Sequence, residues 1–79
     1  MKARITITLK KGVMDAQGQT VQRALEHLGF STVNSLRIGK YLEMELEGGD
    51  PSAAKSEVEE MCRKLLANPV IEEFQVAIE

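Results

Sequence analysis

Residues 4–10 read RITITLK, and this short stretch decides the fold. Its apolar side chains, Ile5, Ile7 and Leu9, alternate with polar ones. A period of two with β-branched residues is typical of a strand that is buried on one side only. The rest of the chain must therefore supply the neighbouring strands and a cover for this apolar face.

Two helices are predicted from apolar residues that recur every three to four positions. The first helix presents Val21, Ala24, Leu25 and Leu28 on one face. The second helix presents Ala54, Val58, Met61, Cys62 and Leu65 on one face. Asp15 and Asp50 are placed to cap the two N-termini, whereas Gly29 and the pair Asn68-Pro69 are placed to end the helices.

Three more strands complete the pattern. Phe30–Ile38 is predicted as a strand with a bulge or a late start, and Gly39-Lys40 as a tight hairpin turn into Tyr41–Glu47. Glu73–Glu79 alternates again. The order β-α-β-β-α-β predicts an α+β, ferredoxin-like domain over residues 1–79, with a four-stranded antiparallel sheet and two helices on one face. In that layout Arg4 and Lys10 lie across from the glutamates at 43, 45 and 47.

Size and composition predict that the chain associates. A domain of 79 residues has a thin core, and its one cysteine, Cys62, excludes an internal disulfide. The one histidine, His27, leaves no zinc cluster. We therefore expect a homodimer or a higher homo-oligomer. The net charge of −2 argues against nucleic-acid binding, and the chain shows neither a signal peptide nor a membrane span, which favours the cytoplasm.

The loop Gly12–Val21, GVMDAQGQTV, is the first candidate site. It lacks the lysine of a Walker loop, and Asp15 places negative charge where a phosphate would lie. Asp15 is better explained as a helix cap, and Gly12 as the turn out of the strand. Capping does not require Gly18. A purely local role is the favoured explanation there, and the missing side chain as room for close approach by another backbone or a ligand is the alternative.

Other candidates for chemistry are weak. The neighbouring members of Glu43, Glu45 and Glu47 are about 6.8 Å apart along a strand, too far to converge on one metal ion. His27 is predicted at the surface and Cys62 in the core. Only Tyr41 could stack a base on the open sheet face, so RNA binding is not favoured. No triad or acid–base pair is visible, and we expect no catalysis by this chain alone.

Three stretches together point to a family. They are LKKGVMDAQGQTVQRALEHLGF (Leu9–Phe30), SLRIGKYLEMEL (Ser35–Leu46) and LLANPVIEEFQV (Leu65–Val76). The chain resembles PurS, the small subunit of phosphoribosylformylglycinamidine synthase. The resemblance implies a non-catalytic subunit that bridges a glutaminase (PurQ-like) and a large synthetase (PurL-like) subunit in purine biosynthesis and supports ammonia transfer. It also implies that ATP, Mg²⁺ and glutamine are used by those partners and that this chain binds no cofactor.

The resemblance provides a set of candidate partner contacts, with the loop from Gly12 to Gly18 preferred. They are Lys10, Gly12, Asp15, Gly18, Arg37, Gly39, Lys40, Asn68 and Pro69.

A regulatory domain of the ACT type remains the alternative. That class shares the β-α-β-β-α-β order and an Asp-x-x-Gly at the first strand–helix junction, which Asp15 to Gly18 would match. Such a domain would bind a small amino acid at a dimer interface.

Overall fold

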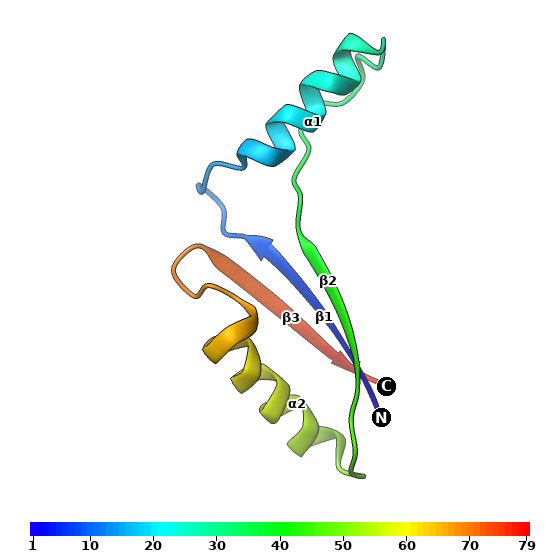
Figure 1. Cartoon of the computed structure of the whole chain (residues 1–79), viewed down its shortest axis with the longest axis vertical. Coiled ribbons are helices and arrows are strands. Elements are labelled where there is room, and N and C mark those ends of the chain that lie inside the picture. The colour runs from blue at the N-terminus through cyan, green and yellow to red at the C-terminus, as the bar shows by residue number, and fades with distance from the viewer.

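The computed structural model describes residues 1–79, and it has one sheet and two helices, of which one lies beside the sheet (Figure 1). In chain order its elements are β1 (Lys2–Leu9), α1 (Ala16–His27), β2 (Lys40–Glu45), α2 (Pro51–Met61), the π-helical turn η1 (Cys62–Leu66) and β3 (Glu72–Ile78). The α+β class with an antiparallel sheet is thereby confirmed. No helix is long and apolar enough to cross a bilayer.

The sheet has three strands in the order β2-β1-β3, and both pairings are antiparallel. The central strand is the one on which the prediction was built, and its residues Ile5 and Ile7 are fully buried. They pack with Val58 and Cys62 of the second helix in the main core. Burial of these alternating side chains on one face is what fixes the register.

The predicted fourth strand is absent, and the hairpin at Gly39-Lys40 is wrong. Residues 31–39 are not assigned to any strand, and the chain runs without a turn from this segment into β2. Gly39 does not have the positive φ that a tight turn of the hairpin type requires. Its Cα lies so close to β1 that a Cβ there would stand 2.6 Å from the Ile7 carbonyl oxygen.

The expectation that both helices cover the sheet holds only for α2. Figure 1 shows α2 lying along the sheet, whereas α1 points away from it beyond one end. The helix α1 stays close to the segment that comes after it in the chain, since the Gln22 Nε2 amide donates to the Val33 carbonyl oxygen at 3.1 Å. Because that segment continues straight into β2, α1 is carried outward with it. We call α1 together with residues 28–38 the arm.

The helix ends agree with the sequence prediction. Asp15 accepts a hydrogen bond from the Gly18 N–H and Asp50 accepts one from the Ser52 N–H, as N-caps do. Gly29 comes just after α1 with a φ of +99°, the left-handed conformation that ends helices. The chain leaves helical structure just before Asn68 and Pro69, as expected.

One side chain of the second helix faces the other way from the prediction. The five residues Cys62–Leu66 form a π-helical turn, which contains one more residue than an α-helical turn would. The apolar face is therefore shifted by one position: Leu65 is 83% exposed, whereas Leu66 packs against the core. Cys62 is buried, as predicted, and burial raises the pKa of its thiol.

The charged pairs on the sheet differ in part from the expected ones. Arg4 does lie opposite Glu43 in the register, but its ion pair is with Glu79 at 3.0 Å, while Lys2 pairs with Glu43 at 3.0 Å. The hydrogen bond with Lys2 holds the pKa of the Glu43 carboxyl below its ordinary value. Lys10 lies beyond the end of the strand, so its predicted position across from the glutamates is wrong.

Candidate functional site

The candidate residues gather where the arm meets the sheet, at the C-terminal end of β1. Three segments converge there: the loop after β1, residues 36–40, and the turn before β3. Contacts within this group are made by backbone atoms and by a few charged side chains. We call this group of residues, Lys10, Gly12, Asp15, Gly18, Arg37, Gly39, Lys40, Asn68 and Pro69, the junction.

Asp15 is the centre of the junction on the arm side. One carboxylate oxygen accepts from the Gly18 N–H at 2.8 Å, and the other accepts from the Ile38 N–H at 2.7 Å. The N–H groups of Ile38 and then Gly18 hold the pKa of the Asp15 carboxyl below its ordinary value, although burial opposes them. The side chain therefore ties the first turn of α1 to the segment that leads into β2.

The structure gives a local reason for a glycine at position 18 that the sequence did not reveal. A Cβ at this position would stand 2.5 Å from Asp15 Oδ2 and 2.6 Å from the Leu36 carbonyl oxygen. The close approach expected of a glycine is therefore made by the chain's own backbone. This removes the reason for assigning Gly18 to a partner, and contact through the loop stays a prediction.

Lys10 and Arg37 hold the other side of the junction. The Lys10 Nζ donates to the Pro69 carbonyl oxygen at 2.7 Å, and the Arg37 guanidinium donates to the Lys10 carbonyl oxygen at 3.2 Å. Lys10 also joins β1 to the turn before β3, because its N–H donates to the Ile71 carbonyl oxygen at 2.8 Å. Both cations thus bind backbone oxygens of this chain.

Asn68 and Glu72 shape the turn that precedes β3. The Asn68 side chain accepts from the Val70 N–H at 3.0 Å, and the Asn68 N–H donates to a Glu72 carboxylate oxygen at 2.7 Å. The second oxygen of Glu72 lies 3.6 Å from Lys40 Nζ. Glu72 contacts two residues of the junction, Asn68 and Lys40, and sequence reasoning missed it because it resembles any other polar residue at the start of a strand.

A shallow hollow of about 200 Å³ lies within the junction, between the end of β1 and the start of α1. Asp15, Lys40 and Glu72 are the charged residues in its lining. The carboxylate of Asp15 is already bonded to two backbone N–H groups, so the Asp-x-x-Gly pattern has a structural use here. No group of three His, Cys, Asp or Glu side chains is arranged to hold a metal ion.

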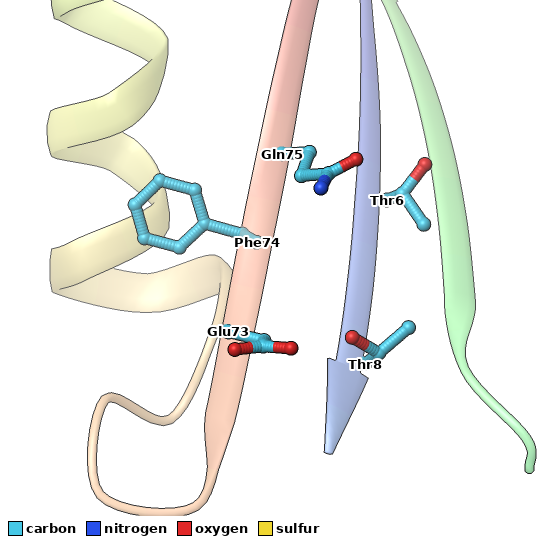
Figure 2. Close-up of a pocket in the computed structure, with 5 residues that line it drawn as sticks. All are labelled: Thr6, Thr8, Glu73, Phe74 and Gln75. Carbon is cyan, nitrogen blue, oxygen red and sulfur yellow. The ribbon is translucent and has the colours of Figure 1, made fainter. Parts of the chain in front are cut away.

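A second hollow, of about 250 Å³, lies on the polar face of the sheet (Figure 2). Thr6 lies opposite Gln75, and Thr8 opposite Glu73, across the β1–β3 pair. Figure 2 shows these four side chains facing one another and Phe74 pointing to the opposite side, toward the helix. The hollow therefore offers hydroxyl, amide and carboxylate groups, and Tyr41 lies on the same face of the sheet, opposite Thr6.

Apolar surface is exposed in two places that the sequence analysis predicted to be buried. On the arm, Val21, Leu28 and Phe30 are 40%, 73% and 59% exposed. Beside α2, an open groove of about 410 Å³ has Met44, Met61, Leu65 and Leu66 as its apolar lining. Both surfaces result from the position of the arm, because α1 does not lie on the sheet.

Comparison with known proteins shows consistent similarity over the whole length. The family model described as "PurS: Phosphoribosylformylglycinamidine (FGAM) synthase" matches residues 2–79. The phosphoribosylformylglycinamidine synthase subunit PurS of Methanocaldococcus jannaschii is 47% identical over 78 residues, which cover 99% of this chain and 94% of that protein. The corresponding Bacillus subtilis subunit is 42% identical over 78 residues, covering 99% and 92%.

Solved structures agree with these relatives. The crystal structure of Methanocaldococcus jannaschii PurS superposes with a TM-score of 0.91 at 46% identity, covering 99% of this chain and 94% of that one. A chain from the structure of PurLQS from Thermotoga maritima superposes with a TM-score of 0.88 at 34% identity, covering 96% and 93%. The arrangement of three strands and two helices is thus shared with solved PurS chains.

Proposed function

Because the chain belongs to the PurS family, we propose that it is the small, non-catalytic subunit of a phosphoribosylformylglycinamidine synthase. The family match over residues 2–79 is the observation that carries this proposal. In this role the chain acts in purine biosynthesis as part of a glutamine-dependent ligase. It bridges the glutaminase and synthetase subunits and supports the transfer of ammonia between them.

The relatives support the choice of partners. The Methanocaldococcus jannaschii protein is described as one of the subunits of formylglycinamide ribonucleotide amidotransferase, and the Thermotoga maritima structure carries the combined name PurLQS. By this likeness the chain works with a PurQ-like and a PurL-like subunit. ATP, Mg²⁺ and glutamine are used by those subunits in the proposal, this chain binds no cofactor, and the complex acts in the cytoplasm.

The junction is the surface that we assign to these partners. Its residues lie at one end of the sheet, and several of them, including Lys40, Asn68 and Pro69, are exposed. The backbone there is held by side chains: Asp15 accepts from a backbone N–H, and Lys10 and Arg37 donate to backbone carbonyl oxygens. A surface whose shape is fixed before binding loses less entropy when a partner docks.

The proposed function includes self-association. With nine of its 79 residues buried, a single copy has little interior from which to draw stability. We include in the proposal a homodimer in which the sheet gains the missing fourth strand of the ferredoxin-like arrangement.

Reconstitution tests the function directly. The purified chain is added to a PurQ-like and a PurL-like subunit, and formation of the amidine product is measured with glutamine or with ammonium as the nitrogen source. We expect the glutamine-dependent rate to require all three proteins, whereas the ammonium-dependent rate of the PurL-like subunit alone persists. A full glutamine-dependent rate without this chain would contradict the proposal.

The junction is tested with a matched pair of lysines. Lys40→Ala removes an exposed junction cation, and Lys55→Ala removes an exposed cation of α2 for which no ion pair is found. We expect Lys40→Ala to weaken co-elution with the larger subunits and Lys55→Ala to leave it unchanged. Equal co-elution of both variants would argue against the junction as the contact surface.

A further inference from the structure

Three cations lie together at the end of β1 and form no ion pair. Of the ten lysines and arginines in the chain, five pair with carboxylates, and Lys10, Lys11 and Arg37 are not among them. We call these three residues the cationic cluster. We propose that the cationic cluster binds an acidic segment of the PurQ-like glutaminase subunit. The inference rests on the proposed function and deepens it by naming the partner and the chemistry of the contact.

Backbone oxygens of this chain hold the cationic cluster in place. The Arg37 guanidinium donates to the Lys10 carbonyl oxygen at 3.2 Å, and the Lys10 Nζ donates to the Pro69 carbonyl oxygen at 2.7 Å. Lys11 comes next in the chain and is exposed. Carbonyl oxygens carry no net charge, so these bonds orient the cations without neutralising them. Both side chains keep further N–H donors for a ligand.

The carboxylates near the cluster are engaged elsewhere. Asp15 is buried and accepts from two backbone N–H groups, Glu72 pairs with Lys40, and Glu73 faces Thr8 across the sheet (Figure 2). With Lys40 included, four cations stand against three carboxylates at this end of the sheet, whereas the rest of the chain has six cations and nine carboxylates. The cluster is therefore a positive region on a chain whose net charge is −2.

Exposed apolar side chains lie beside the cluster in the chain. Met14 is 71% exposed and belongs to the same loop as Lys11, and Val70 is 77% exposed and follows Pro69, to which Lys10 is bonded. Protein–protein interfaces combine apolar contacts at the centre with charged groups around them. Cations beside apolar side chains fit a protein segment that carries both carboxylates and apolar residues, whereas a free phosphate would leave the apolar side chains uncovered.

Carboxylates are the groups that the cluster recognises best in a protein. A guanidinium binds a carboxylate through two parallel N–H···O bonds, and an ammonium binds it as a point charge. Nucleic acid offers anionic phosphates instead, but a long polyanion would also meet the nine carboxylates on the rest of the chain. A short acidic segment of a partner protein meets the positive region alone.

Electrostatics favours the glutaminase subunit over the synthetase subunit. In the proposed function the PurL-like subunit uses ATP and Mg²⁺, so cations docked beside its site would attract the nucleotide and repel the metal ion. The PurQ-like subunit uses glutamine, which has no net charge near neutral pH, and neither effect arises there. An acidic segment on the glutaminase therefore gives charge complementarity without disturbing either reaction.

Charge reversal tests the assignment in the complete three-subunit complex. Lys11→Glu reverses a charge that has no ion pair within the chain, so circular dichroism should show an intact fold. Lys55→Glu reverses an exposed charge on α2 that also has no ion pair, and it is the matched control. The glutamine-dependent rate is measured while the PurQ-like subunit is titrated at fixed amounts of the other two proteins, and again while the PurL-like subunit is titrated.

The two titrations should respond differently to Lys11→Glu. At low salt we expect the half-saturating concentration of the PurQ-like subunit to rise by about tenfold, and that of the PurL-like subunit to change by less than about twofold. Added sodium chloride should reduce the difference from Lys55→Glu, because salt screens exposed charges. Equal PurQ-like titrations for the two variants, or a selective rise in the PurL-like titration, would overturn the proposal.

A second measurement locates the contact itself. A water-soluble carbodiimide joins a lysine amine to a carboxylate in direct contact with it, with loss of water. After treatment of the complex, mass spectrometry should find peptides in which Lys10 or Lys11 is joined to an aspartate or glutamate of the PurQ-like subunit. Links from these lysines to the PurL-like subunit only, or no more links than Lys55 gives, would contradict the proposal.

The outcomes separate this inference from the proposed function. If the parent chain supports the glutamine-dependent rate but Lys11→Glu behaves like Lys55→Glu, the assignment to the cationic cluster is wrong and the assembly role stands. If the parent chain joins neither larger subunit and supports no glutamine-dependent rate, the assembly role is wrong and the assignment falls with it.

Discussion

The two halves of this chain share the plan strand–helix–strand, but only the second half closes on the sheet. In α2, Val58 is fully buried, whereas in α1 the comparable Val21 is 40% exposed. Both helices carry an apolar stripe and an aspartate cap. The difference therefore lies in the connection after each helix and not in the helix itself.

The two connections differ in what the returning segment becomes. After η1, the Asn68 carbonyl oxygen accepts from the Ile71 and Glu72 N–H groups, and the chain reverses at once into β3. After α1 the chain also reverses, where the Phe30 N–H donates to the Leu25 carbonyl oxygen, but the returning segment runs beside α1 and outside the sheet until Asp15 fixes Ile38 at the end of the sheet. An amphipathic helix therefore meets the sheet of its own chain only where the segment that returns along the helix is itself a strand of that sheet.

The largest effect is expected from a charge placed at the two valines. Val58→Asp would bury a carboxylate in the core and should destabilise the fold by roughly 4 kcal/mol or more, leaving the chain unfolded at any concentration. Val21→Asp should leave a folded chain that fails to associate. Circular dichroism over a range of protein concentrations checks both predictions. Similar unfolding of the two variants would contradict the difference between the two halves.

A smaller effect is expected from the two leucines of the π-helical turn. Leu66→Ala should lower the free energy of unfolding by about 2 kcal/mol, because Leu66 packs against the core. Leu65→Ala should lower it by less than about 0.5 kcal/mol when measured on the dissociated chain, because Leu65 is 83% exposed. Urea titration gives both values, and a reversed order would mean that the turn is α-helical in solution.

The arm is expected to depend on Gly18. Gly18→Ala places a methyl group against Asp15 and the Leu36 carbonyl oxygen, which should cost about 1–2 kcal/mol even after the gain in helix propensity. Gly49→Ala, where a Cβ meets open space, is the control and should be neutral. Thermal unfolding compares the two. Equal melting temperatures would show that Asp15 and Leu36 can move away freely.

The smallest effect is expected from the charge of Asp15. Its pKa is lowered in the folded chain, so the unfolded chain binds the proton more tightly. The stabilisation by this carboxylate is therefore present above its unfolded pKa, near 4, and is lost as the pH falls through the folded value. In the Asp15→Asn variant, this stabilisation should depend less on pH. Amide hydrogen exchange at Gly18 and Ile38, measured from pH 6 to acidic pH, checks this prediction. The quantity compared is the ratio of the exchange rate in the variant to that in the parent, since the intrinsic exchange rate also changes with pH.

Much of the local structure was predictable from the sequence. The alternation in RITITLK located the central strand, and Asp15, Asp50 and Gly29 located helix ends, because these signals depend on near neighbours. The straight passage through Gly39 was not predictable, since it depends on the long-range bond between Asp15 and Ile38. The orientation of Leu65 was missed because a single extra residue in a helical turn leaves no clear pattern in the sequence.

The candidate site was predicted as a set of residues but not as a structure. Motif positions from three separate stretches lie together at the junction, which no single stretch indicated. Glu72 was missed, and the local contacts of Gly18 were not identified, because both depend on contacts that the local sequence pattern does not encode.

The sheet order β2-β1-β3 has a consequence for how the fold forms. The strand that comes first in this sequence lies in the middle, and Lys2 on that strand exchanges two backbone hydrogen bonds with Glu79. Pairing between such distant residues slows folding, because a long loop must close before any contact rewards it. The sheet therefore closes only after β3 has been made, and a chain lacking β3 would leave the apolar row of β1 with a neighbour on one side only.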